Sequence, residues 1–343
     1  MMLSEVIREW SIEFTLLLLV LTLLLTKTAK AAADARRSLV SKGPRLVVIS
    51  GCDSGFGEMA ARKITSIPGY QVLSLCLTPD GVKRMESAGV YKAMQCDVTN
   101  AKDIERVANA VTLIASSSPS SLKLWALINN AGVAPIGYVD WMKEDLFRSS
   151  MEVNYFGLVS MTKAMLPFLK KTRGGRIINI SSMAGLIGSP GFGAYAATKH
   201  AVEGFSKSLR EEMQPWGIYV CNINPAFMKT PLIENSIIGA QTSLQNADPD
   251  VRSQYPSNVL ESSTQLILKV QEDPNKVVDV IVSSLQVTHP SRNYYVGYQA
   301  KVLRLVLLLP TWLLGFITNA LRNENAGPTR EALDRIQSGD ESG

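Results

Sequence analysis

The chain has 343 residues, of which 46% are hydrophobic and 19% charged, and its net charge of +5 is mild; this suits one large α/β domain with appended segments, or two small domains. The basic residues are scattered, without a dense tract or interleaved aromatic side chains, so we do not expect binding to nucleic acid. Only two histidines are present and the four cysteines form no C-x-x-C pair, which argues against a Ser-His-Asp hydrolase, a disulfide framework and a metal site.

The N-terminal segment, residues 1–28, is predicted to be a membrane anchor because Trp10 to Thr28 is dominated by Leu, Val and Thr. Its purely apolar part of about 12 to 15 residues is short for a full span of about 20. A cleaved secretory signal and a mitochondrial presequence are the alternatives, and both are disfavoured because Glu5 and Glu9 precede the run. The basic linker at 29–44 favours a cytosolic domain, which we expect at the endoplasmic reticulum, with a mitochondrial membrane as the alternative.

From residue 45 to about residue 300, short apolar runs alternate with longer amphipathic ones. The runs predict strands at Arg45–Ser50, Gln71–Leu77, Tyr91–Cys96, Leu124–Asn129, Arg176–Ser181, Tyr219–Ile223 and Asn293–Tyr298. The amphipathic pattern predicts helices at Phe56–Ser66, Asn100–Ser117, Lys143–Lys171 and Gly193–Met213. Strands that are apolar on both faces and joined by helices indicate a single Rossmann-type α/β domain, a doubly wound parallel sheet with helices on both faces.

Three further segments follow a different pattern. Residues 229–275 are polar and rich in Ser, Asn and Gln, which predicts an irregular substrate lid. Residues 301–322 are apolar but interrupted by Pro310, and we favour a membrane-associated segment there over a helix packed on the core. The tail at 323–343 is polar and is expected to be mobile.

A glycine-rich sequence, Ser50 to Gly57, follows the first strand and opens the first helix. Glycines at such a turn let the backbone approach a pyrophosphate at the helix N-terminus, although a tight turn without a ligand could have the same spacing. The next strand ends at Leu77 to Asp80 without a basic side chain to bind a 2′-phosphate, so NAD(H) is favoured over NADP(H). Lys83 and Arg84 lie close enough in sequence to reach back, and Asp80 is a candidate ribose ligand.

A second motif, Tyr195-Ala196-Ala197-Thr198-Lys199, places Tyr and Lys at positions i and i+4 of a predicted helix, on one face. A free phenol with a pKa of about 10 is a poor base, and a nearby lysine cation would lower that pKa toward the range useful for acid–base catalysis. The pair alone is common on protein surfaces. Ser182, Asn154 and the sequence Asn129 to Gly132 accompany it, and in a doubly wound sheet the strand ends line the same carboxyl edge.

Together these motifs resemble the classical short-chain dehydrogenase/reductase family from about Arg45 to Tyr298. The resemblance implies that Ser182 orients the substrate oxygen, Tyr195 exchanges its proton, Lys199 binds the nicotinamide ribose and lowers the Tyr195 pKa, and Asn154 holds a water in the proton relay. The hydride itself is carried by the cofactor. The cofactor-binding residues that it implies are Gly51, Asp53, Ser54, Gly55, Phe56, Gly57, Asp97, Val98, Asn130, Ala131, Gly132, Tyr195, Lys199, Pro225 and Thr230. Among these, Asp97 would contact the adenine. One departure is Ala226, where the family usually has glycine after the proline.

The sequences from Gly51 to Gly57, Cys76 to Pro79 and His289 to Tyr295 are similar to the branch of retinol, hydroxysteroid and 3-hydroxybutyrate dehydrogenases. The resemblance implies a membrane-associated, NAD-dependent alcohol dehydrogenase for a lipophilic substrate such as a retinol or hydroxysteroid, and a homodimer formed through the two long helices. A 3-hydroxybutyrate dehydrogenase is the alternative within the branch. A non-catalytic nucleotide-binding scaffold is the alternative from another class, and it is disfavoured because none of the four catalytic positions is substituted.

Overall fold

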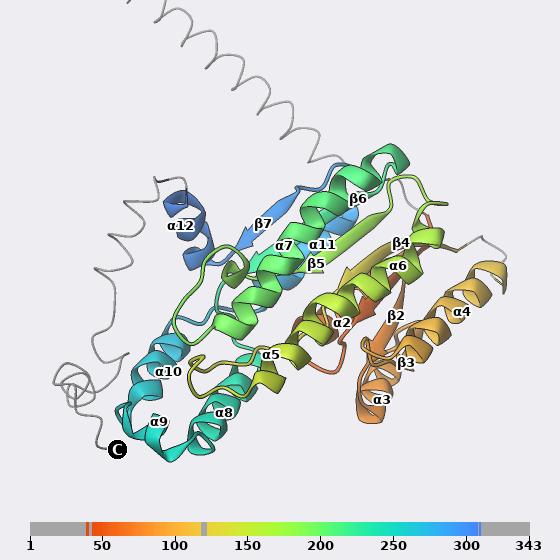
Figure 1. Cartoon of the computed structure of the whole chain (residues 1–343). Helices are drawn as coiled ribbons and strands as arrows, with labels where there is room; N and C mark the ends of the chain where they lie inside the picture. Colours follow the sequence, from red (N-terminus) through yellow and green to blue (C-terminus); the bar gives the residue numbers. More distant parts are fainter. Residues whose placement is uncertain (1–38, 41–42, 118–121, 308, 310–343) are drawn as a thin grey trace, which may run out of the picture.

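The computed structural model describes residues 39–40, 43–117, 122–307 and 309. They contain a seven-stranded sheet in the order β3-β2-β1-β4-β5-β6-β7, in which all neighbouring strands are parallel (Figure 1). The strands are β1 (Arg45–Ser50), β2 (Tyr70–Cys76), β3 (Lys92–Gln95), β4 (Lys123–Asn129), β5 (Arg176–Ile180), β6 (Tyr219–Pro225) and β7 (Asn293–Val296). The strand order reverses between β1 and β4, the switch point at which open α/β sheets bind ligands.

Strand β1 explains why both faces of the sheet are covered. Successive side chains of a strand point to opposite faces. Leu46 and Val48 belong to one apolar cluster, Val47 and Ile49 belong to the other, and all four are fully buried. Because neither face of the strand can be left in water, helices must pack on both sides, as the doubly wound fold class predicted.

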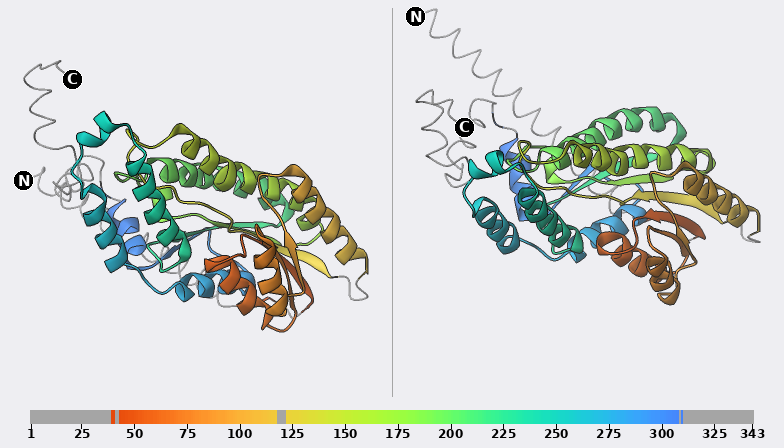
Figure 2. Two further views of the ribbon diagram at one scale, coloured as in Figure 1. Left: turned by 90° about the horizontal axis from the view of Figure 1, so that it is seen from below. Right: turned by 60° about the horizontal axis from the view of Figure 1, so that its bottom comes forward.

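Two groups of helices provide this cover (Figure 2). Side chains of α2 (Gly55–Thr65), α3 (Pro79–Ser87) and α11 (Asn275–Gln286) pack into the cluster that contains Val47 and Ile49. Side chains of α4 (Ala101–Ser117), α6 (Leu158–Leu169) and α7 (Gly193–Met213) pack into the cluster that contains Leu46 and Val48. The helices α3 and α11 lie outside the elements that the sequence pattern predicted.

The predicted helix at Lys143–Lys171 is divided into three parts. It begins as α5 (Glu144–Met151), widens into the π-helical segment η1 (Glu152–Gly157), and continues as α6. An apolar pattern with a period near 3.6 does not reveal one wider turn, so the interruption was not predicted. Single π-turns are frequently found at functional sites, and this one contains Asn154.

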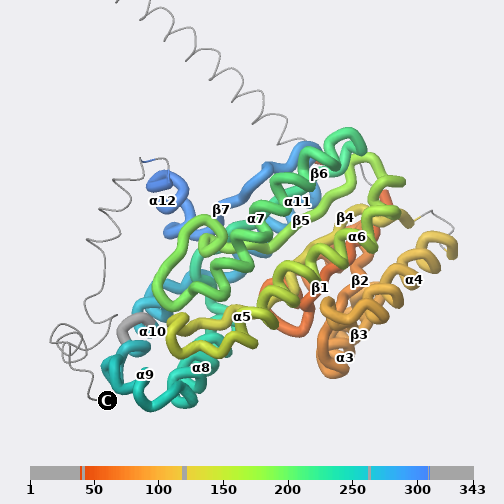
Figure 3. Tube along the Cα trace, in the orientation of Figure 1, coloured from red at the N-terminus to blue at the C-terminus, as the bar shows by residue number. Residues whose placement is uncertain are grey.

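The prediction that residues 229–275 are irregular is wrong. This segment, called the lid segment below, contains α8 (Pro231–Gln245), α9 (Pro249–Ser253) and α10 (Val259–Lys269), and then leads into α11. Prolines at the start of α8 and α9 fit a first helical turn, where no backbone N–H is needed. The high content of Ser, Asn and Gln concealed the helical pattern. Figure 3 shows these helices as one continuous stretch of chain that leaves the sheet after β6 and leads to α11.

The predicted anchor at 1–28, all but four residues of the linker at 29–44, and the tail at 323–343 lie outside the described residues. The segment predicted at 301–322 is described only through residue 307 and at residue 309, and its first part belongs to α12 (Tyr298–Val306). Among the described residues, no helix combines the length and the apolar character needed to cross a bilayer.

Candidate active site

The glycine-rich turn at the carboxyl end of β1 is tightly built. Gly51 and Gly55 have φ angles of 69° and 59°, in the left-handed region that favours glycine. A Cβ atom on Gly57 would lie 2.2 Å from the carbonyl oxygen of Gly51, so no side chain fits there. Helix α2 begins directly within this turn, after Ser54, whose side chain makes no capping hydrogen bond. Its first-turn amides are therefore available to an anion, as the predicted pyrophosphate site requires.

The turn after β4 is fastened to this glycine-rich turn. Asn130 Nδ2 donates hydrogen bonds to the carbonyl oxygens of Ser50 and Gly51, at 3.0 and 2.9 Å. The backbone amides of Asn130 and Ala131 both donate to Ser50 Oγ, at 3.1 Å. The predicted cofactor-binding residues of the two turns are thus brought together at the switch point of the sheet.

The acidic group at the carboxyl end of β2 is Asp53 rather than Asp80. Asp53 accepts hydrogen bonds from the amides of Leu77 and Thr78, at 2.6 and 3.0 Å, and from Thr78 Oγ1 at 2.6 Å. The Asp80 side chain is 80% exposed and lies 3.7 Å from Lys83 Nζ. Arg84 Nη2 does reach back, since it donates to the carbonyl oxygen of Asp53 at 2.7 Å.

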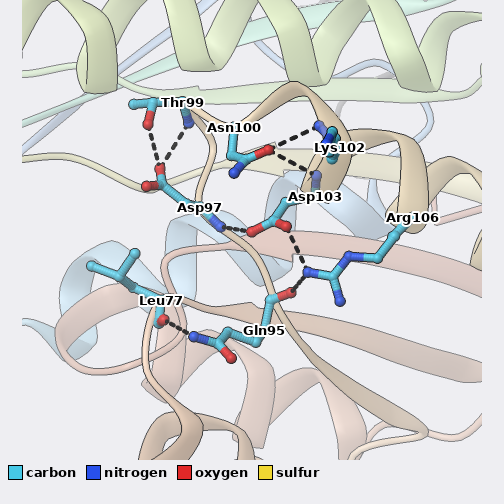
Figure 4. A network of polar contacts seen from close by, with 8 residues as sticks. All are labelled: Leu77, Gln95, Asp97, Thr99, Asn100, Lys102, Asp103 and Arg106. Carbon is cyan, nitrogen blue, oxygen red and sulfur yellow. Dashed lines mark hydrogen bonds and ion pairs between the residues drawn. The ribbon is translucent and has the colours of Figure 1, made fainter.

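Asp97 lies in a hydrogen-bonded turn just beyond β3 (Figure 4). Its Oδ1 accepts from the amide and the hydroxyl of Thr99, at 2.8 and 2.7 Å. Its own amide donates to Asp103 at 2.9 Å, and this bond, with that from Arg106, lowers the pKa of Asp103. The neighbouring Val98 is buried. Asp97 is therefore held rigidly at the edge of the sheet where the adenine is predicted to bind.

Asn154 joins the turn after β4 to helix α7. From its π-helical turn, the buried side chain accepts from the Val133 amide and donates to the Val133 carbonyl oxygen, each at 2.8 Å. Its Nδ2 also donates to Thr198 Oγ1 at 2.9 Å. Since Thr198 is in the turn of α7 between Tyr195 and Lys199, Asn154 fixes the part of the helix that carries both.

Lys199 lies at the centre of the predicted catalytic group. Its residue is only 5% exposed, and Nζ donates to the carbonyl oxygen of Ile180 at 2.8 Å. Nζ is 5.7 Å from the centre of the Tyr195 ring. A Cβ atom on Gly132 would lie 3.8 Å from Nζ and 3.1 Å from Asn154 Oδ1. The structure therefore brings together residues that are widely separated in the sequence.

The proton-transfer pair has pKa values that differ from the expected ones. Burial raises the pKa of Tyr195 to about 12, and a side-chain hydrogen bond with Ser182 only partly opposes this effect. Burial also lowers the pKa of Lys199 to about 8, against the attraction of the Glu203 charge. The expected lowering of the Tyr195 pKa by Lys199 is therefore not observed, because desolvation by burial is the largest influence and the only opposing one is the hydrogen bond with Ser182. Ser182 is placed by its own turn, where its Oγ accepts from the Ala184 amide at 3.1 Å.

The end of β6 completes the site. Thr230 is buried directly before α8, and a Cβ atom on Gly55 would lie 3.8 Å from Thr230 Cβ, so the end of β6 meets the glycine-rich turn. The methyl group of Ala226, the departure after Pro225, lies against Gly297: a Cβ atom on Gly297 would be 2.9 Å from it. The extra methyl group is therefore accommodated on the side of the turn that leads into α12.

The lid segment is attached to the rest of the domain at its base and near its middle. The Lys229 amide donates to the Glu272 carbonyl oxygen at 3.0 Å, and the Glu272 amide donates to the Phe227 carbonyl oxygen at 2.9 Å. Near the middle, the Tyr255 ring lies 4.7 Å from that of Trp141, and Tyr255 donates to Asp140 at 2.9 Å. Both partners belong to the loop between β4 and α5.

An aromatic pair lies at the start of α7, the helix that carries Tyr195. The rings of Phe192 and Phe227 are 6.1 Å apart, and Phe192 directly precedes α7, the helix of Tyr195. Both are partly buried. The pair provides an apolar surface close to the catalytic tyrosine candidate.

Comparison with known proteins agrees with this geometry. The family model for short chain dehydrogenases matches residues 45–239. The chain belongs to the short-chain dehydrogenase family. It is 34% identical over 294 residues to "Dehydrogenase/reductase SDR family member 9" of Homo sapiens, covering 83% of this chain and 90% of that protein. It is 33% identical over 280 residues to "Retinol dehydrogenase 16" of Mus musculus, covering 79% and 86%. The predicted family resemblance, on its retinol dehydrogenase side, is confirmed.

Two solved structures show that this short-chain dehydrogenase shares its fold with distant relatives. One, from Burkholderia phymatum in complex with NAD, is 22% identical, with a TM-score of 0.59 and coverage of 74% of this chain and 89% of that one. The other, from Burkholderia cenocepacia in complex with NADP, is 20% identical, with a TM-score of 0.62 and coverage of 82% and 99%. Family and relatives together identify an NAD(P)-dependent short-chain dehydrogenase.

Proposed function

We propose that this short-chain dehydrogenase interconverts an alcohol and a carbonyl on a lipophilic substrate of the retinol or hydroxysteroid type, with NAD(H) and at a membrane. The observation that carries the proposal is the convergence of Tyr195, Ser182 and Lys199 near Gly132, in the turn after β4 that is hydrogen bonded to the glycine-rich turn. The names of the retinol dehydrogenase relatives support the substrate class.

In the proposed mechanism, the bound dinucleotide supplies or accepts the hydride. Ser182 Oγ donates a hydrogen bond to the substrate oxygen and orients it, while the Tyr195 hydroxyl exchanges a proton with that same oxygen. The Lys199 ammonium binds the ribose and stabilises negative charge on the phenol as its proton leaves. Asn154 keeps α7 in place through Thr198 and holds a water of the proton relay.

The residues at the switch point fit a dinucleotide, because Gly51 and Gly55 make the sharp turn and the start of α2 has no side-chain cap on its first amides, which can therefore bind a pyrophosphate. NAD(H) is favoured by Asp53. Its carboxylate is hydrogen bonded at the end of β2, where a ribose 2′-position is read, and its negative charge would repel a 2′-phosphate. Arg84 is the nearest group that could instead favour NADP(H).

Membrane association is supported by α12, which directly precedes the apolar sequence that continues to residue 322. Tyr298 and Leu305 are 74% and 66% exposed, and Lys301 and Arg304 could meet anionic headgroups. In a vesicle flotation assay, Leu305→Glu should weaken binding of the full-length protein. The control is Leu113→Glu, at a similarly exposed leucine of α4. Equal flotation of all three proteins would contradict a role for α12.

The experiment that tests the catalytic proposal is a substrate panel with purified protein. Retinols, hydroxysteroids and 3-hydroxybutyrate are each supplied with NAD+ or NADP+, and absorbance of the reduced cofactor is followed. We expect turnover with a retinol or hydroxysteroid and NAD+. A strong preference for 3-hydroxybutyrate would contradict the lipophilic substrate class. Cofactor binding without turnover on any alcohol or carbonyl would point to a nucleotide-binding scaffold.

Protease accessibility in sealed vesicles tests the cytosolic orientation expected at the endoplasmic reticulum, and the molecular mass in detergent tests the proposed homodimer.

A further inference from the structure

A buried carboxylate that the proposed mechanism does not use lies one helical turn beyond Lys199. Glu203 is 4% exposed. Tyr195, Lys199 and Glu203 follow one another at intervals of four residues, so they lie along one face of α7. No described residue forms a direct ion pair with Glu203. Burying an acidic group without a paired cation is costly, so its presence here requires a physical explanation.

The first contact of Glu203 leads to Ser182. Asn224 Nδ2 donates to Glu203 Oε1 at 2.6 Å and to the carbonyl oxygen of Ser182 at 3.2 Å. Glu203 also packs against the turn that Ser182 opens, because a Cβ atom on Gly185 would lie 3.1 Å from Glu203 Cγ. The carboxylate therefore supports the Ser182 turn from behind, through one amide and one close packing contact.

The second relationship is electrostatic and leads to Lys199. Burial lowers the pKa of Lys199 to about 8, and the charge of Glu203 acts in the opposite direction. Glu203 has the same influence on Arg210, further along α7, whose pKa is also lowered by burial. The ammonium of Lys199 is the nearer of the two cations in the sequence of the helix and the one that belongs to the active site.

Apart from Arg210, which keeps its charge because a guanidinium is not deprotonated in proteins, the described groups named next are uncharged. The turn η2 (Met183–Gly185) has no ionisable side chain, and Asn224 on β6 is an amide. Cys221, also on β6, is a thiol whose pKa is raised to about 12 by burial. Tyr195 is likewise neutral below its pKa of about 12. A change in the charge at position 203 should therefore be felt mainly by Lys199.

We propose that Glu203 is a positioning residue of the active site: held by Asn224, it fixes the Ser182 turn and supplies the counter-charge that keeps the buried Lys199 protonated. The inference rests on the proposed roles of Ser182 and Lys199. It assigns two effects to one side chain, and these can be separated because one depends on charge and the other on length.

Two variants separate the effect of the Glu203 charge from the effect of its side-chain length. Glu203→Gln keeps an oxygen for Asn224 but removes the charge, whereas Glu203→Asp keeps the charge but shortens the side chain. Glu211→Gln is the matched control, since Glu211 is an exposed residue of the same helix. Each protein is assayed for kcat/KM and for NADH binding by fluorescence, from about pH 6 to about pH 10, with circular dichroism as a check on folding.

For Glu203→Gln, we expect the alkaline limb of both profiles to move down by about one pH unit, because Lys199 loses its proton more easily. At about pH 9 this is a loss of about tenfold in kcat/KM, while at about pH 6 the variant stays within about twofold of wild type. For Glu203→Asp, we expect an unmoved limb and a kcat lowered by about tenfold at every pH, because the Ser182 turn is displaced. The control should match wild type in both respects.

A folded Glu203→Gln variant with an unmoved alkaline limb would overturn the counter-charge role. A Glu203→Asp variant with normal kcat would overturn the positioning role, and this arm remains decisive if the Gln variant does not fold. Failure of the proposed function gives a different pattern, namely wild-type protein that binds NADH but converts no alcohol or carbonyl. In that case the binding profiles alone still test the effect of Glu203 on Lys199.

Discussion

Asn154 Nδ2 donates a hydrogen bond of 2.9 Å to Thr198 Oγ1, and Thr198 in turn donates one of 2.8 Å to the carbonyl oxygen of Tyr195. The π-helical turn that carries Asn154 is thus connected to the backbone of the catalytic tyrosine candidate. The same amide group forms two hydrogen bonds with the Val133 backbone, so one side chain sets the distance between the turn after β4 and helix α7.

We therefore predict that Asn154→Ala lowers kcat by about 10- to 100-fold, because Tyr195 and Lys199 lose a fixed position relative to the cofactor turn. The variant also removes the three hydrogen bonds of the buried Asn154 side chain, which should lower the free energy of unfolding by about 3 kcal/mol. Steady-state kinetics and urea denaturation measure the two effects. Ser149→Ala, at an exposed serine of the preceding helix, is the control. An Asn154→Ala variant with wild-type kcat would refute the positioning role.

Cofactor preference should change with Asp53. Replacing it by Ser removes the carboxylate next to the expected 2′-position, so we predict that kcat/KM with NADP+ rises about 10- to 100-fold relative to NAD+. Arg84, which stays bonded to the backbone carbonyl oxygen of residue 53, would then be the nearest cation to the phosphate, and Asp53→Ser combined with Arg84→Ala should lose the gain. Asp80→Ser is the matched control, because Asp80 points to solvent. An unchanged cofactor ratio in Asp53→Ser would show that preference is set elsewhere.

The buried charge of Lys199 should lower the free energy of unfolding. Its pKa is lowered from 10.5 to about 8, so the folded state binds fewer protons than the unfolded state between these values. The cost of the buried charge is therefore fully present below about pH 8 and disappears as the pH rises toward that of an unfolded lysine. We predict that Lys199→Met is inactive and is more stable than wild type at neutral pH by up to about 3 kcal/mol, a value that already includes the attraction to Glu203.

The measurement is urea denaturation of both proteins at about pH 7 and about pH 10. The advantage of the methionine variant should be largest at the lower pH and nearly absent at the higher one. Lys207→Met, at an exposed lysine of the same helix, should show no such pH dependence. An advantage that grows with pH would contradict the assigned sign.

The aromatic contact of Tyr255 should control access to the site. Tyr255→Ala removes the ring that packs on Trp141 and the hydrogen bond to Asp140, so the lid segment loses its attachment to the loop after β4. We predict that KM for a lipophilic alcohol rises about tenfold, with a smaller change in kcat. Tyr255→Phe keeps the ring and should raise KM by about twofold or less. If both variants have the same KM as wild type, the lid segment does not close over the substrate.

Much of the sheet could be predicted from the sequence because the information is local. Short apolar runs located all seven strands, and glycine spacing located the turn after β1. The pair Tyr195 and Lys199 was found because helical spacing alone places both on one face. These are features in which a short stretch of chain determines its own conformation.

What could not be predicted depends on contacts between distant segments. The helices of the lid segment mix Ser, Asn and Gln with their apolar residues, and the segment is attached through partners such as Trp141, which contacts Tyr255 between α9 and α10. The spacing of four residues between Lys199 and Glu203 was a signal that the sequence offered. An acidic residue in a helix is usually exposed, however, and only the contact with Asn224 distinguishes Glu203 from an ordinary surface residue. The raised pKa of Tyr195 reflects burial by the whole fold, which no spacing reports.

The most direct test of the account is the effect of Tyr195→Phe on turnover and on cofactor binding, measured on the same protein. NADH formation from the best alcohol of the panel is followed at saturating NAD+, and NADH binding is measured by fluorescence. Because the substitution removes only the hydroxyl that exchanges the proton, we predict a fall in kcat of about 10²- to 10⁴-fold, with NADH affinity within a few-fold of wild type. Equal turnover by Tyr195→Phe and wild type would contradict the account.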